Sequence, residues 1–110
     1  MIVGGFSQGS MLACDVALHA AEKPGGLILL SSTLIAQRRW QPLMPSMRGL
    51  PILQTHGTLD PLLPYDDATA LRDLLVAQGA ALSFESFEGG HEIPPAVIAR
   101  MGAFIGTHAP

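Results

Sequence analysis

Apolar and polar positions along the chain form blocks that predict strands and helices in alternation. Short apolar runs predict strands over residues 1–6, 27–31, 51–56 and 81–87. Stretches with helical spacing predict helices over residues 8–21, 65–78 and 95–105. Because about four strands alternate with helices, we expect an α/β fold with a mostly parallel sheet and right-handed crossovers.

The same pattern predicts how deeply each element is buried. The continuous apolar run from Gly25 to Leu30 is typical of a strand covered on both faces. Residues 81–87 alternate, with Leu82 and Phe84 between polar neighbours, which indicates an edge or half-exposed strand. The inward stripes expected for the last two helices are Leu71, Leu74, Leu75 and Gln78, followed by Val97, Ile98, Met101, Phe104 and Ile105.

A G-x-S-x-G pattern at residues 5–9 lies between the first predicted strand and the first predicted helix. This pattern is typical of a sharp turn that presents a nucleophilic serine, here Ser7. We expect Ser7 to have a strained backbone, and a Cβ atom at Gly5 or Gly9 to collide with the neighbouring backbone. Three fixed positions can match by chance, so the interpretation depends on partners further along the chain.

Two later loops supply those partners in the order serine, acid, histidine. Asp60 follows the predicted strand at 51–56, and Pro61 biases it away from helical backbone. His91 follows the last predicted strand, after Gly89 and Gly90. Because loops after parallel strands meet at one edge of an open sheet, we expect the three side chains to converge there.

The segments GFSQG, HGTLDPLLP and GGHEIP closely resemble the carboxylesterase and acyl-protein thioesterase branch of the α/β-hydrolases. The resemblance covers nearly the whole chain. It implies Ser7 as nucleophile, Asp60 as acid and His91 as general base, with the backbone N–H of Gln8 as an oxyanion donor. Where the family has a second glycine after GFSQG, this chain has Ser10.

The resemblance further implies a serine hydrolase that cleaves carboxylic esters or acyl thioesters without a metal or organic cofactor. The family's earlier strands would lie upstream of Met1, so residues 1–110 are expected to be the C-terminal portion of one α/β-hydrolase domain. We therefore expect weak activity or none, and self-association through an exposed strand edge near Ile2 and Val3. A serine peptidase of the same fold, and a non-catalytic fragment that binds an acyl ligand or a partner, remain alternatives.

Residues 32–50 have no clean period. One interpretation is a flap that walls an acyl-binding groove, with Trp40, Leu43 and Met44 as apolar lining. The other is an irregular connection whose apolar groups complete the core. Leu62, in the loop after Asp60, is a further candidate substrate contact.

Composition narrows the choice of partners and location. The 110 residues are 48% hydrophobic and 14% charged, with a net charge of −3. No basic run is present, which argues against nucleic acid, and no apolar stretch is long enough to span a bilayer. His91-Glu92 is followed by proline at position 95, so it is not the H-E-x-x-H zinc motif. We expect a cytoplasmic location, although a segment upstream of Met1 would leave export open.

Cys14 is the only cysteine, so no disulfide can form within the chain. We interpret it as a small buried residue of the first helix.

Overall fold

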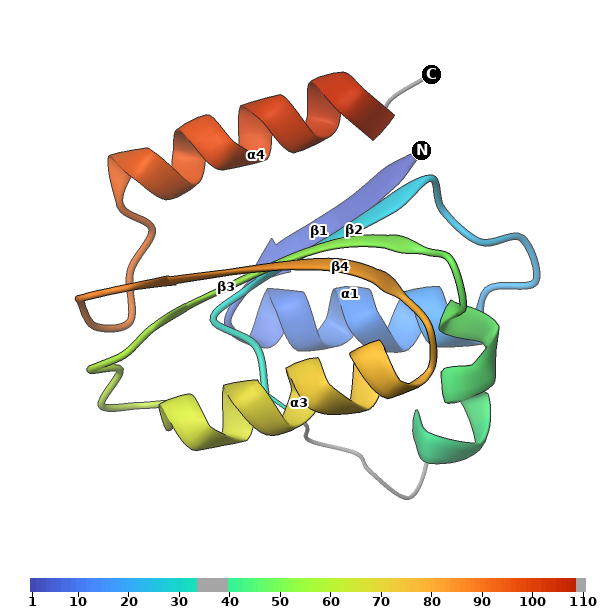
Figure 1. The fold of residues 1–110 in the computed structure, drawn as a ribbon, viewed down its shortest axis with the longest axis horizontal. Helices are drawn as coiled ribbons and strands as arrows, with labels where there is room; N and C mark the ends of the chain where they lie inside the picture. The colour runs from blue at the N-terminus through green and yellow to red at the C-terminus, as the bar shows by residue number, and fades with distance from the viewer. Residues whose placement is uncertain (34–39, 109–110) are drawn as a thin grey trace.

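The computed structural model describes residues 1–33 and 40–108 (Figure 1). Within these ranges the chain forms four strands, three α-helices and one 3₁₀ segment. In chain order they are β1 (Ile2–Phe6), α1 (Gln8–His19), β2 (Gly26–Leu30), η1 (Gln41–Met47), β3 (Pro51–Gly57), α3 (Tyr65–Ala77), β4 (Ala81–Phe87) and α4 (Pro95–His108).

The four strands form one parallel sheet in the order β1-β2-β3-β4. Each strand lies beside the next one in sequence, so right-handed crossovers place α1 and α3 on the same face of the sheet. Figure 1 shows the result, with α1 and α3 below the sheet and α4 alone above it. The predicted α/β fold with about four parallel strands is confirmed.

Each face of the sheet has its own apolar core. The larger core lies under α1 and α3 and includes Leu27, Leu29 and Ile52 from the strands. The smaller core lies under α4, where Val97 and Phe104 pack against Ile28, Leu30 and Leu53. All five residues of β2 are buried, as its continuous apolar run predicts, whereas no residue of β4 is.

The inward stripe predicted for the last helix is wrong at two positions. Val97 and Phe104 are buried, but Ile98 is 59% exposed and Ile105 is 42% exposed. Successive helical residues are rotated by about 100°, because there are 3.6 residues per turn. Ile98 and Ile105 therefore lie one step around the helix from the pair that touches the sheet.

β1 is an edge strand, and β2 is its only strand partner among residues 1–33 and 40–108. Beside it, Leu12 and Val16 of α1 are 64% and 49% exposed. None of the described helices is both long and apolar enough to cross a membrane.

Candidate active site

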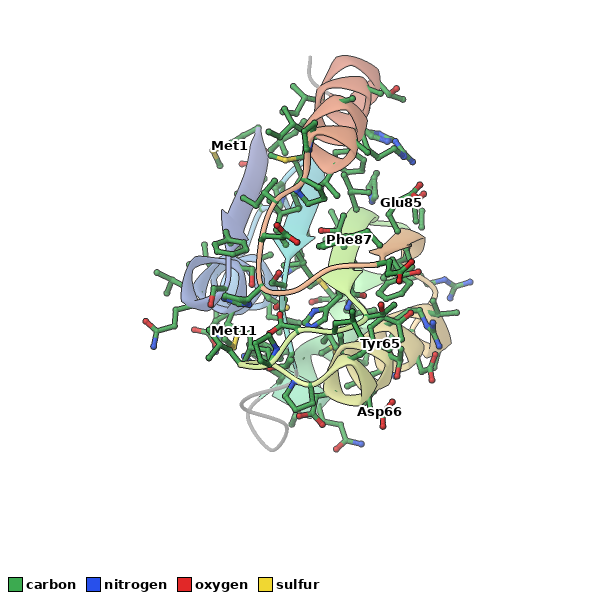
Figure 2. The ribbon with its side chains drawn as sticks, turned by 90° about the vertical axis from the view of Figure 1, so that its left-hand side faces the viewer. Met1, Met11, Tyr65, Asp66, Glu85 and Phe87 are labelled. Atoms are coloured by element: carbon green, nitrogen blue, oxygen red, sulfur yellow. The ribbon has the colours of Figure 1, made fainter. Side chains whose placement is uncertain are left out.

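The candidate site lies at the edge of the sheet where the strands end, which Figure 2 views face on. Three turns meet there: the one from β1 to α1, the loop from β3 to α3, and the loop from β4 to α4. Phe87, labelled in Figure 2, marks the end of β4, and Tyr65 marks the start of α3. Ligands of open parallel sheets bind at this edge.

Ser7 occupies the sharp turn between β1 and α1. Its backbone has φ 58° and ψ −122°, which lies outside the regions that a side chain normally adopts. The Ser7 N–H donates to the Leu30 carbonyl of β2 at 2.8 Å, and the Ser7 carbonyl accepts from the Met11 N–H at 3.2 Å. The neighbouring strand and the helix thus both hold the strained residue in place.

Glycine at position 5 is required by the closeness of this turn. A Cβ atom on Gly5 would lie 2.3 Å from the carbonyl carbon and oxygen of Gly9, which no real contact allows. The same expectation is wrong for Gly9, because an added Cβ would meet no atom within 4 Å. The backbone of Gly9 occupies the space where a Cβ atom of residue 5 would lie. A Cβ atom of residue 9 would instead point into open space.

Ser10, which replaces the family's glycine, is fully buried, and its hydroxyl donates to the Ser7 carbonyl. The sequence analysis did not predict this bond. A serine in the first turn of a helix often donates its hydroxyl to a nearby backbone carbonyl, and this tendency could have predicted the bond.

Asp60 is fixed by the loop that follows β3. One carboxylate oxygen, Oδ1, accepts the N–H groups of Leu62 and Leu63 at 2.9 and 2.8 Å. The other, Oδ2, lies 2.7 Å from Nδ1 of His91. Burial would raise the pKa of Asp60, but the hydrogen bonds from Leu63, His91 and Leu62 outweigh it and hold the pKa below its usual value. Asp60 therefore stays a carboxylate at neutral pH.

His91 joins Asp60 to Ser7. Its Nε2 lies 2.9 Å from Ser7 Oγ, while its Nδ1 faces Asp60 Oδ2. Because a carboxylate only accepts, Nδ1 carries the proton and Nε2 is free to accept from the Ser7 hydroxyl. The Phe6 ring packs against the imidazole, with the centroids 4.8 Å apart. The side chain of His91 is 13% exposed, so it is shielded while remaining open to a ligand.

The two loops that carry Asp60 and His91 are bonded directly to each other. The Thr58 N–H donates to the Phe87 carbonyl, and the Leu59 N–H donates to the Gly89 carbonyl, both at 2.9 Å. A Cβ atom on Gly57 would lie 2.3 Å from the Gly90 carbonyl oxygen. Glycine at position 57 therefore lets the two loops approach closely enough for the Asp60–His91 bond.

Gln8 is the first residue of α1, directly after Ser7. The first N–H groups of a helix have no partner within the helix, and they lie at the positive end of its dipole. The Gln8 amide is therefore available to an anion that forms beside Ser7.

Two residues predicted to line a substrate groove lie elsewhere. Trp40 and Met44 have no exposed surface and pack in the larger core, and the indole N–H of Trp40 donates to Asp15 at 2.8 Å. Leu43 is partly buried against the same core. The interpretation as an irregular connection that completes the core replaces the groove lining for Trp40 and Met44. Residues 34–39 of this segment lie outside the described residues.

Leu43 and Leu62 are the remaining predicted substrate contacts. Leu43 is partly buried against the larger core, whereas Leu62 is 68% exposed and follows Asp60 by two residues. Among the residues that the structure describes, no three metal-binding side chains lie close enough together to hold an ion.

Comparison with known proteins agrees with this geometry. A parallel α/β sheet that delivers serine, histidine and aspartate to one edge is typical of the α/β-hydrolases. The family model described as phospholipase/carboxylesterase matches residues 1–109, and the chain belongs to this family. The resemblance inferred from GFSQG, HGTLDPLLP and GGHEIP is thereby confirmed.

The curated relatives include two fungal acyl-protein thioesterases 1. The protein from Neurospora crassa is 36% identical over 95 residues, which is 83% of this chain and 39% of the relative. The protein from Gibberella zeae is 27% identical over 114 residues, covering 100% of this chain and 48% of the relative. The chain thus spans less than half the length of these relatives.

Solved structures show the same correspondence. Esterase PE8 superposes with a TM-score of 0.84 at 27% identity, over 97% of this chain and 49% of that protein. Acyl-protein thioesterase 2 from Zea mays superposes with a TM-score of 0.83, over 96% of this chain and 54% of the maize protein, and at 21% identity it supports the fold only.

Proposed function

We propose that this chain carries the nucleophile, base and acid of a serine hydrolase that cleaves carboxylic esters or acyl thioesters. The supporting observation is the continuous chain of hydrogen bonds from Ser7 Oγ through His91 to Asp60, with distances of 2.9 and 2.7 Å. A serine hydroxyl is a weak nucleophile until a base accepts its proton, and the base must be held in one tautomer. Both requirements are met in this arrangement.

The reaction begins when Ser7 Oγ attacks the acyl carbonyl and its proton passes to Nε2 of His91. Asp60 stabilises the imidazolium that forms. The Gln8 N–H donates to the oxyanion of the tetrahedral intermediate. His91 then gives its proton to the leaving alcohol or thiol, and an acyl-enzyme remains on Ser7. Water then attacks the acyl carbonyl as its proton passes to His91. The bond to Ser7 Oγ breaks, His91 returns the proton to Oγ, and the carboxylic acid leaves.

Turnover of matched substrates tests this function. p-Nitrophenyl butyrate, a butyryl thioester and a peptide p-nitroanilide are offered to the wild-type chain and to Ser7→Ala. The account expects ester and thioester hydrolysis that Ser7→Ala abolishes. Faster cleavage of the anilide would favour a peptidase, and hydrolysis that survives in Ser7→Ala would refute the proposed nucleophile.

Leu62 is proposed to contact the acyl chain, because it is apolar, exposed and adjacent to the acid loop. Leu62→Ser is expected to lower kcat/KM for octanoyl esters more than for acetyl esters. Ile98→Ser is a matched control, since Ile98 is similarly exposed but lies on α4. Equal losses for both acyl lengths in Leu62→Ser would contradict this role.

Self-association through β1 is also proposed. Among the described residues this strand pairs only with β2, so the hydrogen-bonding groups along its other side are open to a second copy of the chain. Sedimentation velocity at rising protein concentration is expected to show growing oligomers. A monomer at every concentration would contradict this proposal.

A further inference from the structure

His56 is a buried histidine that the proposed mechanism does not use. It lies near the end of β3, four residues before Asp60, and its side chain has no exposed surface. Its Nε2 is 2.7 Å from the Leu63 carbonyl oxygen and 3.4 Å from Asp60 Oδ2. His56 therefore contacts both ends of the turn that holds the candidate acid.

The neighbours of Nε2 determine which tautomer is present. A carbonyl oxygen and a carboxylate oxygen are both acceptors, so Nε2 must carry the proton. The short bond of this N–H goes to the Leu63 carbonyl, and Asp60 Oδ2 is a second, more distant acceptor at 3.4 Å. Nδ1 then holds a lone pair, and it is buried with no hydrogen-bond partner among the described residues.

The unpartnered Nδ1 bears on why a histidine occupies this place. A buried acceptor that has lost its water without gaining a partner destabilises the folded state. An apolar side chain of similar size would fill the space without that cost. What histidine adds is one N–H, which faces the turn from Asp60 to Leu63 (the acid turn). An apolar residue could not supply it.

We propose that His56 is a positioning residue for the Asp60 carboxylate, and this inference rests on the proposed function of Ser7, His91 and Asp60. The bond to Leu63 closes the turn whose Leu63 N–H donates to Asp60 Oδ1. The N–H of His56 also lies beside Oδ2, the oxygen that faces His91. Together these contacts fix the plane of the Asp60 carboxylate. They thereby fix the direction in which Oδ2 accepts the N–H of His91 Nδ1.

The consequence for the reaction concerns the imidazole of His91. If the carboxylate rotates, the bond between Asp60 Oδ2 and Nδ1 weakens, and the imidazolium loses part of its stabilisation. The alignment of His91 with Ser7 then loosens. A misplacement of about 1 Å costs up to about 10²-fold in rate, so we expect a loss of about 10–100-fold.

The first test is nitrogen NMR on the unmodified chain at pH 7. The proposal expects the His56 proton on Nε2 and the His91 proton on Nδ1. A His56 proton on Nδ1 would overturn the proposal, because the N–H would then not face Leu63 and Asp60. This measurement needs no variant and no catalytic turnover, so it tests the inference even if the proposed hydrolase function fails.

The second test compares variants by the rate at which a fluorophosphonate labels Ser7. His56→Leu removes the N–H and is expected to slow labelling about 10–100-fold. His56→Gln keeps an N–H at the same distance along the side chain, and it is expected to restore much of the rate. Labelling by folded His56→Leu at the wild-type rate would overturn the proposal.

Gln54→Leu is the matched control for a merely structural effect. Gln54 is buried two residues earlier on the same strand, and its amide donates to the Ala68 carbonyl at 2.9 Å. Gln54→Leu therefore removes a similar bond that does not touch the acid turn. It is expected to lower stability while the rate of Ser7 labelling stays close to that of the wild type. Labelling that slows equally in folded Gln54→Leu and His56→Leu would overturn the positioning role.

Discussion

Replacing Gly57 by alanine tests whether the loops of the acid and the histidine must approach as closely as the structure shows. The added Cβ would lie 2.3 Å from the Gly90 carbonyl oxygen and 2.4 Å from that of Gly89. A carbon and a carbonyl oxygen normally approach to about 3.3–3.6 Å, so the loop that carries His91 must move by about 1 Å.

A shift of that size has a calculable effect at the site. The bond of 2.9 Å between His91 and Ser7 would lengthen towards about 4 Å, beyond hydrogen-bond range. We expect a loss of about 10²-fold in the rate at which Ser7 reacts. Overpacking adds a cost of about 1–3 kcal/mol in the free energy of unfolding.

The assay is the second-order rate of fluorophosphonate labelling, measured by intact mass under conditions where circular dichroism shows each variant folded. Gly90→Ala is the control, because an added Cβ there meets only the Pro61 side chain, at 3.8 Å. It is expected to label at close to the wild-type rate. If folded Gly57→Ala also labels at the wild-type rate, the argument from close approach is refuted.

Three further outcomes follow from named contacts. The pKa of Asp60 is held below its usual value of about 3.9. The Asp60 carboxylate therefore stabilises the folded state above that value, and this stabilisation is lost as the pH falls through the lowered pKa. Urea unfolding of Asp60→Asn should show a smaller loss of stability on acidification than the wild type, and an identical loss would contradict this. Trp40→Phe removes the indole bond to Asp15 and should cost about 1–3 kcal/mol in urea unfolding while leaving acyl-chain preference unchanged; a changed preference would restore the groove interpretation. Burial, with a smaller effect from Asp15, raises the pKa of Cys14 to about 12, so a thiol reagent should modify it only after unfolding, and rapid modification of the native chain would be inconsistent with the packing.

Much of the fold could be predicted because each element has a strong local signal. The apolar run of β2 predicted a fully buried strand, and the alternation of β4 predicted an edge or half-exposed one. The helical spacing of α3 predicted both its position and its buried side. The exposure of Ile98 and Ile105 could not be predicted in this way. Periodicity identifies an apolar helix face, but it does not show which residues of that face touch the neighbouring sheet.

The site was partly predictable for a similar reason. Ser7, Asp60 and His91 lie in short motifs with glycines or prolines, whose backbone requirements are visible in the sequence. The sequence left the burial of Trp40 open between two interpretations, because the surrounding segment contains prolines and lacks a period. The bond from His56 to the acid turn was also hidden, since it depends on how the chain returns after β3.

Mapping the labelled residue tests the central claim most directly. The intact chain is treated with a fluorophosphonate, digested and analysed by tandem mass spectrometry, with Ser7→Ala and His91→Ala in parallel. The account predicts one adduct on Ser7, no adduct in Ser7→Ala and much slower labelling in His91→Ala. An adduct on another residue, or labelling of Ser7 that does not depend on His91, would contradict it.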